Sequence, residues 1–231
     1  MTENNKDEFI EIARIKEEFI ANASHELKTP IASVRLAAES ALTSLERDDG
    51  MTKSFLEQIL RDSDRMNELI SDLLDLSAME SSDVFMEAFD LHDVIANEIS
   101  YLSKQNKKRI SYKKKKVEIN ANFDDISLAV KNLIKNALKY SPPEENILIQ
   151  IEENDKSVRC SFQDFGSGIS QSDQEKIFER FYRVDKGRSR KVGGTGLGLA
   201  IVKHALDRNN AVIEIVSELD HGSNFTIVFE K

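Results

Sequence analysis

Residues 24–30 combine a histidine, an acid and a hydroxyl at helical spacing. His25 is followed by Glu26, and Thr29 lies four residues after His25, so in a helix His25 and Thr29 share one face, a turn apart. A carboxylate near one ring nitrogen fixes the imidazole tautomer and leaves the other nitrogen free to attack an electrophile. A lone helical histidine is more often a packed or surface residue, so this segment alone leaves both interpretations open.

Two asparagines four residues apart lie in a second segment with strong helical periodicity. Asn132 and Asn136 fall on one helix face with Lys139 or Tyr140. Asparagine is unfavourable inside a helix, so two of them in one helix suggest a functional role. An amide carbonyl suits Mg²⁺, which takes its other ligands from water and phosphate oxygens. The competing interpretation is two asparagines that face solvent.

Two glycine-rich turns complete the chemical inventory. Residues 164–168 follow a predicted strand, and residues 193–199 lead into a predicted helix. Glycine lets the backbone approach a nucleotide closely, and a helix N-terminus favours phosphate. The phosphate-loop ending Gly-Lys-Ser/Thr and the dinucleotide-binding pattern are both missing from these turns. Either turn alone is equally compatible with a surface loop.

The elements that carry the histidine are two predicted helices, which end near residue 79. Pro30 is expected to kink the first helix. Asp48, Asp49 and Gly50 predict a turn, and Thr52 is the expected N-cap of the second helix.

The second helix carries a heptad seam in which Asp62 is the single polar member, and Ile70 and Leu74 widen its apolar stripe. An antiparallel helix pair cannot bury so wide a stripe alone. Two copies forming a four-helix bundle would bury it, so the sequence predicts a homodimer.

The elements that carry the other motifs alternate between helices and strands. Helices are predicted over 91–102, 125–140 and 199–207, and Pro142 and Pro143 end the second of them. Strands are predicted over 110–112, 117–121, 147–152, 157–163, 212–216 and 224–229. The fold class is therefore α+β: a helical hairpin that forms a dimeric four-helix bundle, followed by an α/β sandwich with a mixed sheet.

Composition excludes several functional classes. The net charge of −9 over 231 residues argues against a nucleic-acid partner, which requires basic surface. Lysines 113–116 are interpreted as a solvated strand edge. Cys160 is the only cysteine, which rules out a disulfide within the chain and a cysteine metal site. No apolar run reaches transmembrane length, and residues 1–8 lack a signal-peptide pattern, so no membrane segment is expected in this chain.

Five segments in a fixed order resemble the boxes of the sensor histidine kinases of two-component signalling. The resemblance runs from about residue 15 to residue 229. The segments are the phosphoacceptor box at 25–30, the asparagine box at 132–140, the first glycine box at 164–168, the phenylalanine box at 178–183 and the second glycine box at 194–199. The resemblance implies a dimerisation and histidine phosphotransfer domain at 1–80, a linker at 81–89 and an ATP-binding catalytic domain of the Hsp90, gyrase and MutL type at 90–231.

The resemblance also implies a role for each matching residue. His25 would accept the γ-phosphate of ATP and Glu26 would take up its proton, while Thr29 would help to dephosphorylate a response regulator. Asn136 would ligate Mg²⁺, and Arg183 would stabilise charge at the γ-phosphate. The nucleotide-contacting residues implied are Asn132, Asn136, Lys139, Tyr140, Asp164, Gly166, Gly168, Ile169, Gly194, Thr195, Gly196, Leu197, Gly198 and Leu199.

The implied function is autophosphorylation of His25 followed by transfer to an aspartate of a response regulator receiver domain. The implied cofactors are ATP and Mg²⁺. The implied location is cytoplasmic, either as a free protein or as the cytosolic portion of a membrane-anchored kinase. A scaffold or phosphatase without kinase activity is the main alternative. An ATPase of the Hsp90, gyrase or MutL kind is disfavoured, because those proteins share the asparagine and glycine elements but would not need the His25 box.

The chain departs from the family pattern after its last helix, where the family often has a His-Gly-Gly turn. Arg208, Asn209 and Asn210 stand in its place. Asparagine adopts the left-handed conformation that a helix end requires, so a changed turn is expected rather than lost catalysis.

Overall fold

A computed structural model describes residues 3–47, 50–184 and 194–231 of the chain, with side chains at residue 14 and from residue 17 onward within these ranges. The chain divides into two compact units. The first is Met1–Ser71 with Gly193–Thr195, and the second is Asp72–Val192 with Gly196–Lys231.

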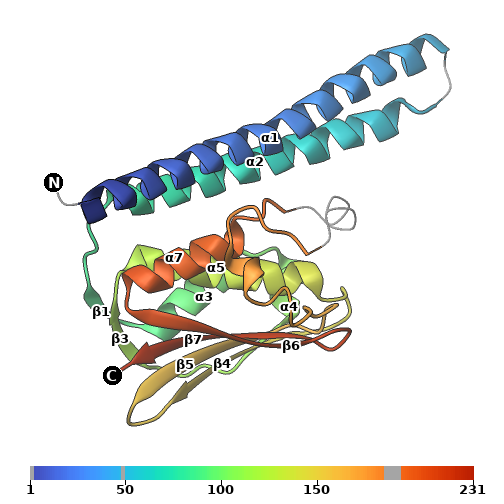
Figure 1. Cartoon of the computed structure of the whole chain (residues 1–231). Coiled ribbons are helices and arrows are strands. Elements are labelled where there is room, and N and C mark those ends of the chain that lie inside the picture. Colours follow the sequence, from blue (N-terminus) through green and yellow to red (C-terminus); the bar gives the residue numbers. More distant parts are fainter. Residues whose placement is uncertain (1–2, 48–49, 185–193) are drawn as a thin grey trace. The chain divides into compact units, whose positions relative to one another are not determined.

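Two long antiparallel helices, α1 (Glu3–Arg47) and α2 (Thr52–Ser81), begin the chain as predicted (Figure 1), and the first unit contains α1 and α2 as far as Ser71. α1 continues through Pro30 without interruption, and the expected kink stays a prediction. α2 begins at Thr52 itself, one residue earlier than the N-cap assignment requires. Of the predicted turn, Asp48 and Asp49 lie outside the described residues, and Gly50 has a left-handed φ of 71°.

The polar member of the heptad seam has a partner on the facing helix. Ser33 donates a hydrogen bond to Asp62 Oδ2 at 2.7 Å, and Gln58 donates to Ser33 at 3.0 Å. Large apolar side chains nevertheless stay exposed on both helices in the single chain, and they include Ile31, Leu36, Leu42, Leu45, Leu56, Leu60 and Ile70. The hairpin therefore has more apolar surface than its two helices cover.

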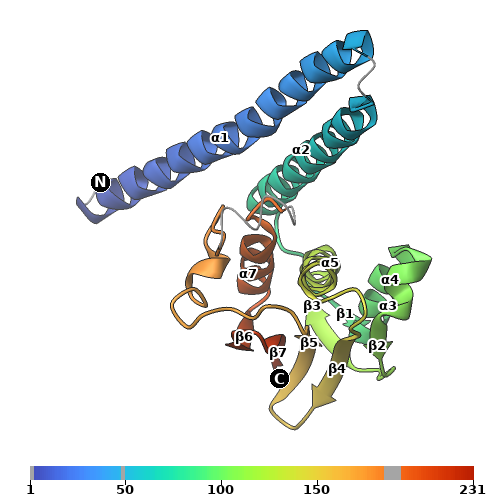
Figure 2. The same cartoon turned by 90° about the vertical axis from the view of Figure 1, so that its right-hand side faces the viewer.

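The second unit is a sheet with helices on one face (Figures 1 and 2). The five-stranded sheet has the order β2-β4-β5-β7-β6, with β2 parallel to β4 and the other pairs antiparallel, so it is mixed as predicted. Its strands are β2 (Ile110–Tyr112), β4 (Ile147–Glu153), β5 (Ser157–Gln163), β6 (Ala211–Glu218) and β7 (Gly222–Glu230). The covering helices are α3 (Leu91–Tyr101), α5 (Phe123–Tyr140) and α7 (Gly198–Arg208).

Two short elements were not predicted. β1 (Glu87–Asp90) pairs antiparallel with β3 (Glu118–Ala121) in a separate two-stranded sheet, and α4 (Lys104–Lys108) precedes β2. β1 is only four residues long, so its strand conformation depends on a partner distant in sequence, which local pattern does not reveal. Lysines 113–116 lie in the connection from β2 to β3 rather than on a strand edge.

The core of the second unit lies between the helices and the sheet. Burial alternates along β5, where Val158, Cys160 and Phe162 are buried, as expected for a strand with one covered face. Asn122 caps α5 by accepting a hydrogen bond from the Asp125 N–H at 3.0 Å. α5 ends at Tyr140, just before the two prolines, as predicted.

The turn after α7 has the conformation that the sequence predicted. Asn210 is left-handed, with a φ of 52°. The buried Asn209 side chain donates to Asp125 Oδ2 at 3.0 Å and to the Ala205 carbonyl at 2.7 Å, and it accepts from the Asn122 N–H at 2.6 Å. These hydrogen bonds join the end of α7 to the start of α5, so the turn fixes the two helices that carry the candidate nucleotide site.

Candidate nucleotide site and phosphoacceptor histidine

His25 lies on the exposed surface of α1. Thr29 is exposed one turn further on, and its hydroxyl donates to the His25 backbone carbonyl at 3.3 Å. The imidazole of His25 is thus accessible to a reaction partner, and Thr29 lies on the same face, as predicted from their spacing.

Glu26 is held by a residue that sequence reasoning missed. Arg65 of α2 donates from Nη2 to Glu26 Oε2 at 3.1 Å, and the side chains of Arg65 and Glu26 are only 17% and 27% exposed. This partly buried ion pair limits the positions available to the carboxylate next to His25. No local motif marks Arg65, because its partner lies 39 residues away in the sequence.

The two asparagines of α5 lie in different environments. Asn132 is buried, and its Nδ2 donates to the Leu128 carbonyl at 2.9 Å. A Cβ on Gly198 would lie 2.9 Å from Asn132 Oδ1, so a side chain at the first residue of α7 would displace the Asn132 amide. Asn136, one turn further along, is half-buried, which leaves part of its side chain accessible to a ligand.

The C-terminal turn of α5 carries Lys139 and Tyr140. Lys139 is half-buried and Tyr140 is 46% exposed. The ammonium of Lys139 lies 5.3 Å from the centre of the Tyr140 ring, within the range of a cation–π contact. An accessible aromatic face and a cation therefore occur side by side at the end of the asparagine helix.

Asp164 is the buried acid of the site. Its Oδ1 accepts hydrogen bonds from the Gly166 N–H at 2.9 Å and the Ser223 N–H at 3.2 Å. Burial raises the pKa of Asp164 above its ordinary value, and the hydrogen bonds from Gly166 and Ser223 oppose that rise. The carboxyl group is therefore fixed in place by the backbone.

The turn after Asp164 packs against backbone on two sides. A Cβ on Gly166 would lie 2.5 Å from the Tyr140 carbonyl oxygen, and the Phe165 N–H donates to Ser141 Oγ at 3.1 Å. Gly168 has a left-handed φ of 65°, and a Cβ there would overlap the Glu218 carbonyl oxygen. The first glycine turn is thus held between the end of α5 and the β6–β7 hairpin.

The residues that hold this turn on the hairpin side were also missed from the sequence. Ser223 contacts Asp164 in both directions: its N–H donates to the Asp164 carboxylate, and its carbonyl accepts from the Asp164 N–H at 2.8 Å. A Cβ on the left-handed Gly222 would overlap the Asp164 carbonyl oxygen. Ile169 donates its N–H to Ser217 Oγ at 2.8 Å. Gly222 at the start of β7 was the one sequence signal that could have indicated a close backbone approach here. Its neighbour Asp164 could not be identified, because only the pairing of β5 with β7 brings the two residues together.

The second glycine turn leads into α7. Gly194 and Gly196 have positive φ values of 123° and 76°. Thr195 and Leu197 are buried, and Leu199 is half-buried in the first turn of α7. Leu197 is the N-cap and has no side-chain acceptor, so the helix start is suited to accept an external anion.

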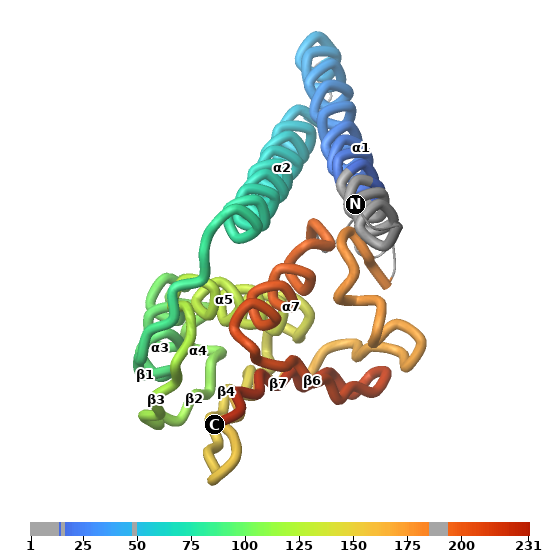
Figure 3. Tube along the Cα trace, turned by 60° about the vertical axis from the view of Figure 1, so that its left-hand side comes forward, coloured from blue at the N-terminus to red at the C-terminus, as the bar shows by residue number. Residues whose placement is uncertain are grey.

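The phenylalanine box lies between the two glycine turns. It begins in a short 3₁₀ helix, η1 (Lys176–Phe178), which packs against α7. Phe178, Phe181 and Arg183 are half-buried. Figure 3 shows this segment in orange.

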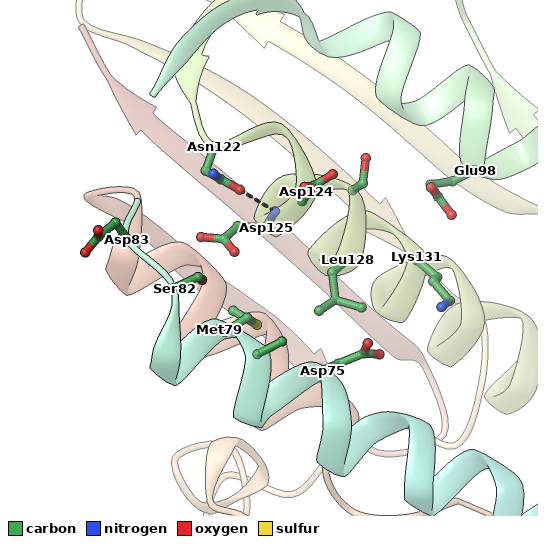
Figure 4. Close-up of a pocket in the computed structure, with 12 residues that line it drawn as sticks. Asp75, Met79, Ser82, Asp83, Glu98, Asn122, Asp124, Asp125, Leu128 and Lys131 are labelled. Atoms are coloured by element: carbon green, nitrogen blue, oxygen red, sulfur yellow. Dashed lines mark hydrogen bonds between the residues drawn. The ribbon is translucent and has the colours of Figure 1, made fainter. Parts of the chain in front are cut away.

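A cavity of about 530 Å³ lies in another part of the second unit. Figure 4 shows side chains from the end of α2, from α3 and from the start of α5 around it, including Asp75, Glu98 and Lys131. None of the sequence-predicted site residues lines this cavity.

The structure therefore brings the predicted nucleotide residues of α5, the Asp164 turn and α7 into one region of the second unit. His25, Glu26 and Thr29 belong to the first unit, as do Gly194 and Thr195. Within the described residues, no group of three or more His, Cys, Asp or Glu side chains is placed to hold a metal ion. Nor is any helix in the described parts of the chain long and apolar enough to cross a membrane.

Two family models match the chain, one over the two long helices and one over most of the sheet unit. The His Kinase A (phospho-acceptor) domain matches residues 15–82. The family described as histidine kinase-, DNA gyrase B- and HSP90-like ATPase matches residues 121–231.

Individual relatives cover nearly the whole chain. It is 32% identical to the sensor-like histidine kinase SenX3 of Mycolicibacterium smegmatis over 97% of its length, and 36% identical to the phosphate regulon sensor protein PhoR of Pseudomonas aeruginosa over 95%. It spans only 60% of SenX3 and 51% of PhoR. Its fold resembles that of histidine kinase ThkA, solved in complex with response regulator protein TrrA, with a TM-score of 0.74 at 20% identity over 100% of this chain and 67% of that one.

Proposed function

Because the chain belongs to the sensor histidine kinases of two-component signalling, we propose that it binds ATP in its second unit and transfers the γ-phosphate to His25. The observation that carries this proposal is the convergence of Asp164, α5 and the start of α7. A buried acid, an asparagine face and a helix N-terminus supply the three kinds of contact that a nucleotide triphosphate requires.

The base of ATP would bind at the Asp164 end of the site. The carboxylate would accept a hydrogen bond from the adenine amino group, which explains why the backbone fixes it so closely. The exposed ring of Tyr140 would pack on the base. Gly166, Gly168 and Ile169 would form the wall of the base site, because this turn is tied to α5 and to the hairpin.

The phosphates would bind toward α7. The N–H groups at the start of α7 favour negative charge, and Gly194, Thr195, Gly196, Leu197, Gly198 and Leu199 form the approach to it. Lys139 would reach the phosphate oxygens, and Arg183 would stabilise charge that develops during transfer.

The half-buried Asn136 is the residue that fits Mg²⁺, because its carbonyl oxygen is a hard ligand. When bound, Mg²⁺ neutralises charge on the phosphates. Asn132 would act from beside the metal by holding α5 against Gly198.

In the transfer step, a bond forms between an imidazole nitrogen of His25 and the γ-phosphorus, and the bond from that phosphorus to the ADP oxygen breaks. The other ring nitrogen loses its proton to Glu26, which Arg65 orients. His25 belongs to the first unit, whereas Asn136 and Asp164 belong to the second, so the reaction requires motion about the linker near Ser81 that brings ATP to His25.

The partners follow from the same reasoning. A second copy of the chain would cover the exposed apolar side chains of α1 and α2, forming a four-helix bundle. A response regulator receiver domain would take the phosphate from His25, and Thr29 would serve the reverse reaction by positioning a water for dephosphorylation. We place these reactions in the cytoplasm, where ATP and the regulator are available.

The test is incubation of the purified chain with γ-labelled ATP and Mg²⁺ beside a His25→Gln variant. A phosphohistidine gives label that is labile in acid and stable in alkali. We expect such label on the parent chain and none on the variant. His221→Gln is the matched control, since His221 lies exposed in the β6–β7 turn and should not affect labelling. Measurable ATP binding without label on the parent would support the scaffold or phosphatase alternative.

A further inference from the structure

Residues 169–184, the described segment after the first glycine turn, are fixed to the sheet at their beginning. Gln174 donates from Nε2 to the Ile169 carbonyl at 3.1 Å and to the Ser217 carbonyl at 3.0 Å. Together with the Ile169 N–H, which donates to Ser217 Oγ, these contacts hold the segment on β6. Its starting position is therefore set by the same strand that supports the base end of the nucleotide site.

Near the other end of the segment, Phe181 is hydrogen-bonded to the second glycine turn. The Phe181 N–H donates to the Gly196 carbonyl at 2.8 Å, and a Cβ on Gly196 would lie 2.9 Å from Phe181 Cα. Phe181 has a left-handed φ of 64°, which is unfavourable for a residue with a side chain. Surrounding contacts must hold Phe181 in this conformation, since the chain would otherwise relax it.

The residue next to Phe181 is held by one carboxylate. Tyr182 donates from its hydroxyl to Asp173 Oδ1 at 2.7 Å, and Ser170 donates to Asp173 Oδ2 at 2.6 Å. The Ser170 and Tyr182 hydrogen bonds lower the pKa of Asp173, and the bond to Asp173 raises the pKa of Tyr182. Asp173 is therefore an ionised acceptor at neutral pH that joins the beginning of the segment to the residue next to Phe181.

We infer that the Tyr182–Asp173 hydrogen bond is a positioning contact that keeps Phe181 left-handed and so holds Gly196 and the start of α7 in place for the phosphates of ATP. The inference rests on the proposed nucleotide site. It assigns no contact with the adenine base to Tyr182 or Asp173, because the base end of the site is held separately through Ser223 and Ser141. Breaking this contact should therefore weaken binding of the phosphates and spare binding of the base.

The test compares binding of ATP with Mg²⁺ to binding of adenosine, each followed by NMR titration of the full chain. Tyr182→Phe and Asp173→Ala should each weaken ATP binding about tenfold, the effect of losing one hydrogen bond to a charged group. Adenosine affinity should not change. The double variant should be no weaker than either single variant, because both remove the same contact. Asp173→Asn keeps an acceptor oxygen and should recover most of the affinity.

Tyr101→Phe is the matched control, because Tyr101 is 76% exposed on α3 and loses the same hydroxyl. Unchanged ATP affinity in both single variants would overturn the inference. A parallel loss of ATP and adenosine affinity would also overturn it, because that result indicates general destabilisation. A parent chain that binds neither ligand would remove the proposed nucleotide site, and the inference with it.

Discussion

The helical hairpin and the sheet unit hold their chemical groups in opposite ways. His25 is exposed on α1, and its neighbour Glu26 forms a side-chain ion pair with Arg65. Asp164 is 5% exposed and is held by backbone N–H groups from two separate segments. A group that must meet several partners in turn needs access, whereas a group that recognises one ligand gains from a fixed position. The comparison predicts that substitutions in the sheet unit impair binding and that substitutions in the hairpin impair chemistry.

The largest expected effect is on nucleotide affinity. Asp164→Asn keeps an oxygen for the Gly166 and Ser223 N–H groups but places a donor where the adenine amino group would donate. ATP affinity should fall about 100-fold, as expected for a lost hydrogen bond to a buried charged acceptor, with little change in melting temperature.

Calorimetric titration with ATP measures this effect. The control is Asp155→Asn in the exposed β4–β5 turn, which should bind ATP like the parent. An Asp164→Asn chain with parental affinity would contradict the assignment of the base site.

The hairpin counterpart is the Arg65–Glu26 pair. Arg65→Met removes the charge and keeps the length of the side chain, so Glu26 loses the partner that orients it. Phosphorylation of His25 at saturating ATP should slow by about tenfold, while the KM for ATP stays the same.

Initial rates of label incorporation over a range of ATP concentrations separate these two quantities. Arg61→Met serves as the control, since Arg61 is 68% exposed and makes only a 4.0 Å contact with Glu57. A raised KM with an unchanged maximal rate would show that Arg65 acts in ATP binding. That result would contradict the division between a hairpin that performs chemistry and a sheet unit that binds the nucleotide.

A smaller effect is expected at the turn that joins α7 to β6. Asn210→Ala should destabilise the sheet unit by roughly 1 kcal/mol, because alanine tolerates the left-handed φ of 52° less well than asparagine. Asn210→Gly should be neutral or slightly stabilising. Denaturant unfolding of the two variants measures the difference, and equal stabilities would show that this conformation carries no strain.

The smallest effect concerns pH. The pKa of Asp164 is raised by burial, so on acidification the folded chain binds this proton at a higher pH than the unfolded chain does. From neutral pH down to about 4, the ordinary pKa of an aspartic acid, the parent should gain stability relative to Asp164→Asn. Melting temperatures of both chains without nucleotide, measured across this range, test the sign. A parent that loses stability relative to the variant would indicate a lowered pKa.

Much of this architecture was predictable because its signals are local. The C-terminal limit of α5 follows from the prolines after Tyr140, whereas its start was predicted at residue 125, two residues after the observed Phe123. The left-handed turn at Asn210 follows from the conformational preference of asparagine. The order of the boxes identified the candidate residues for the nucleotide and for phosphate transfer, since residue type and spacing are properties of the chain itself.

Contacts between distant residues were not predictable in this way. Arg65 beside Glu26, Ser223 beside Asp164, and the β1–β3 pair each join segments separated by tens of residues. The family resemblance implied that Asn132 contacts the nucleotide, but its burial and its contact distance to Gly198 emerge only when α5 packs against α7.

The sequence by itself determined which residue types stand at the candidate site positions and which helices and long strands carry them, because propensity and periodicity act over a few residues. The tertiary structure alone decided which of those residues are buried, which carboxylate is fixed by backbone groups and which side chain orients Glu26. Burial and hydrogen bonding depend on where remote segments meet, and that is a property of the packed fold.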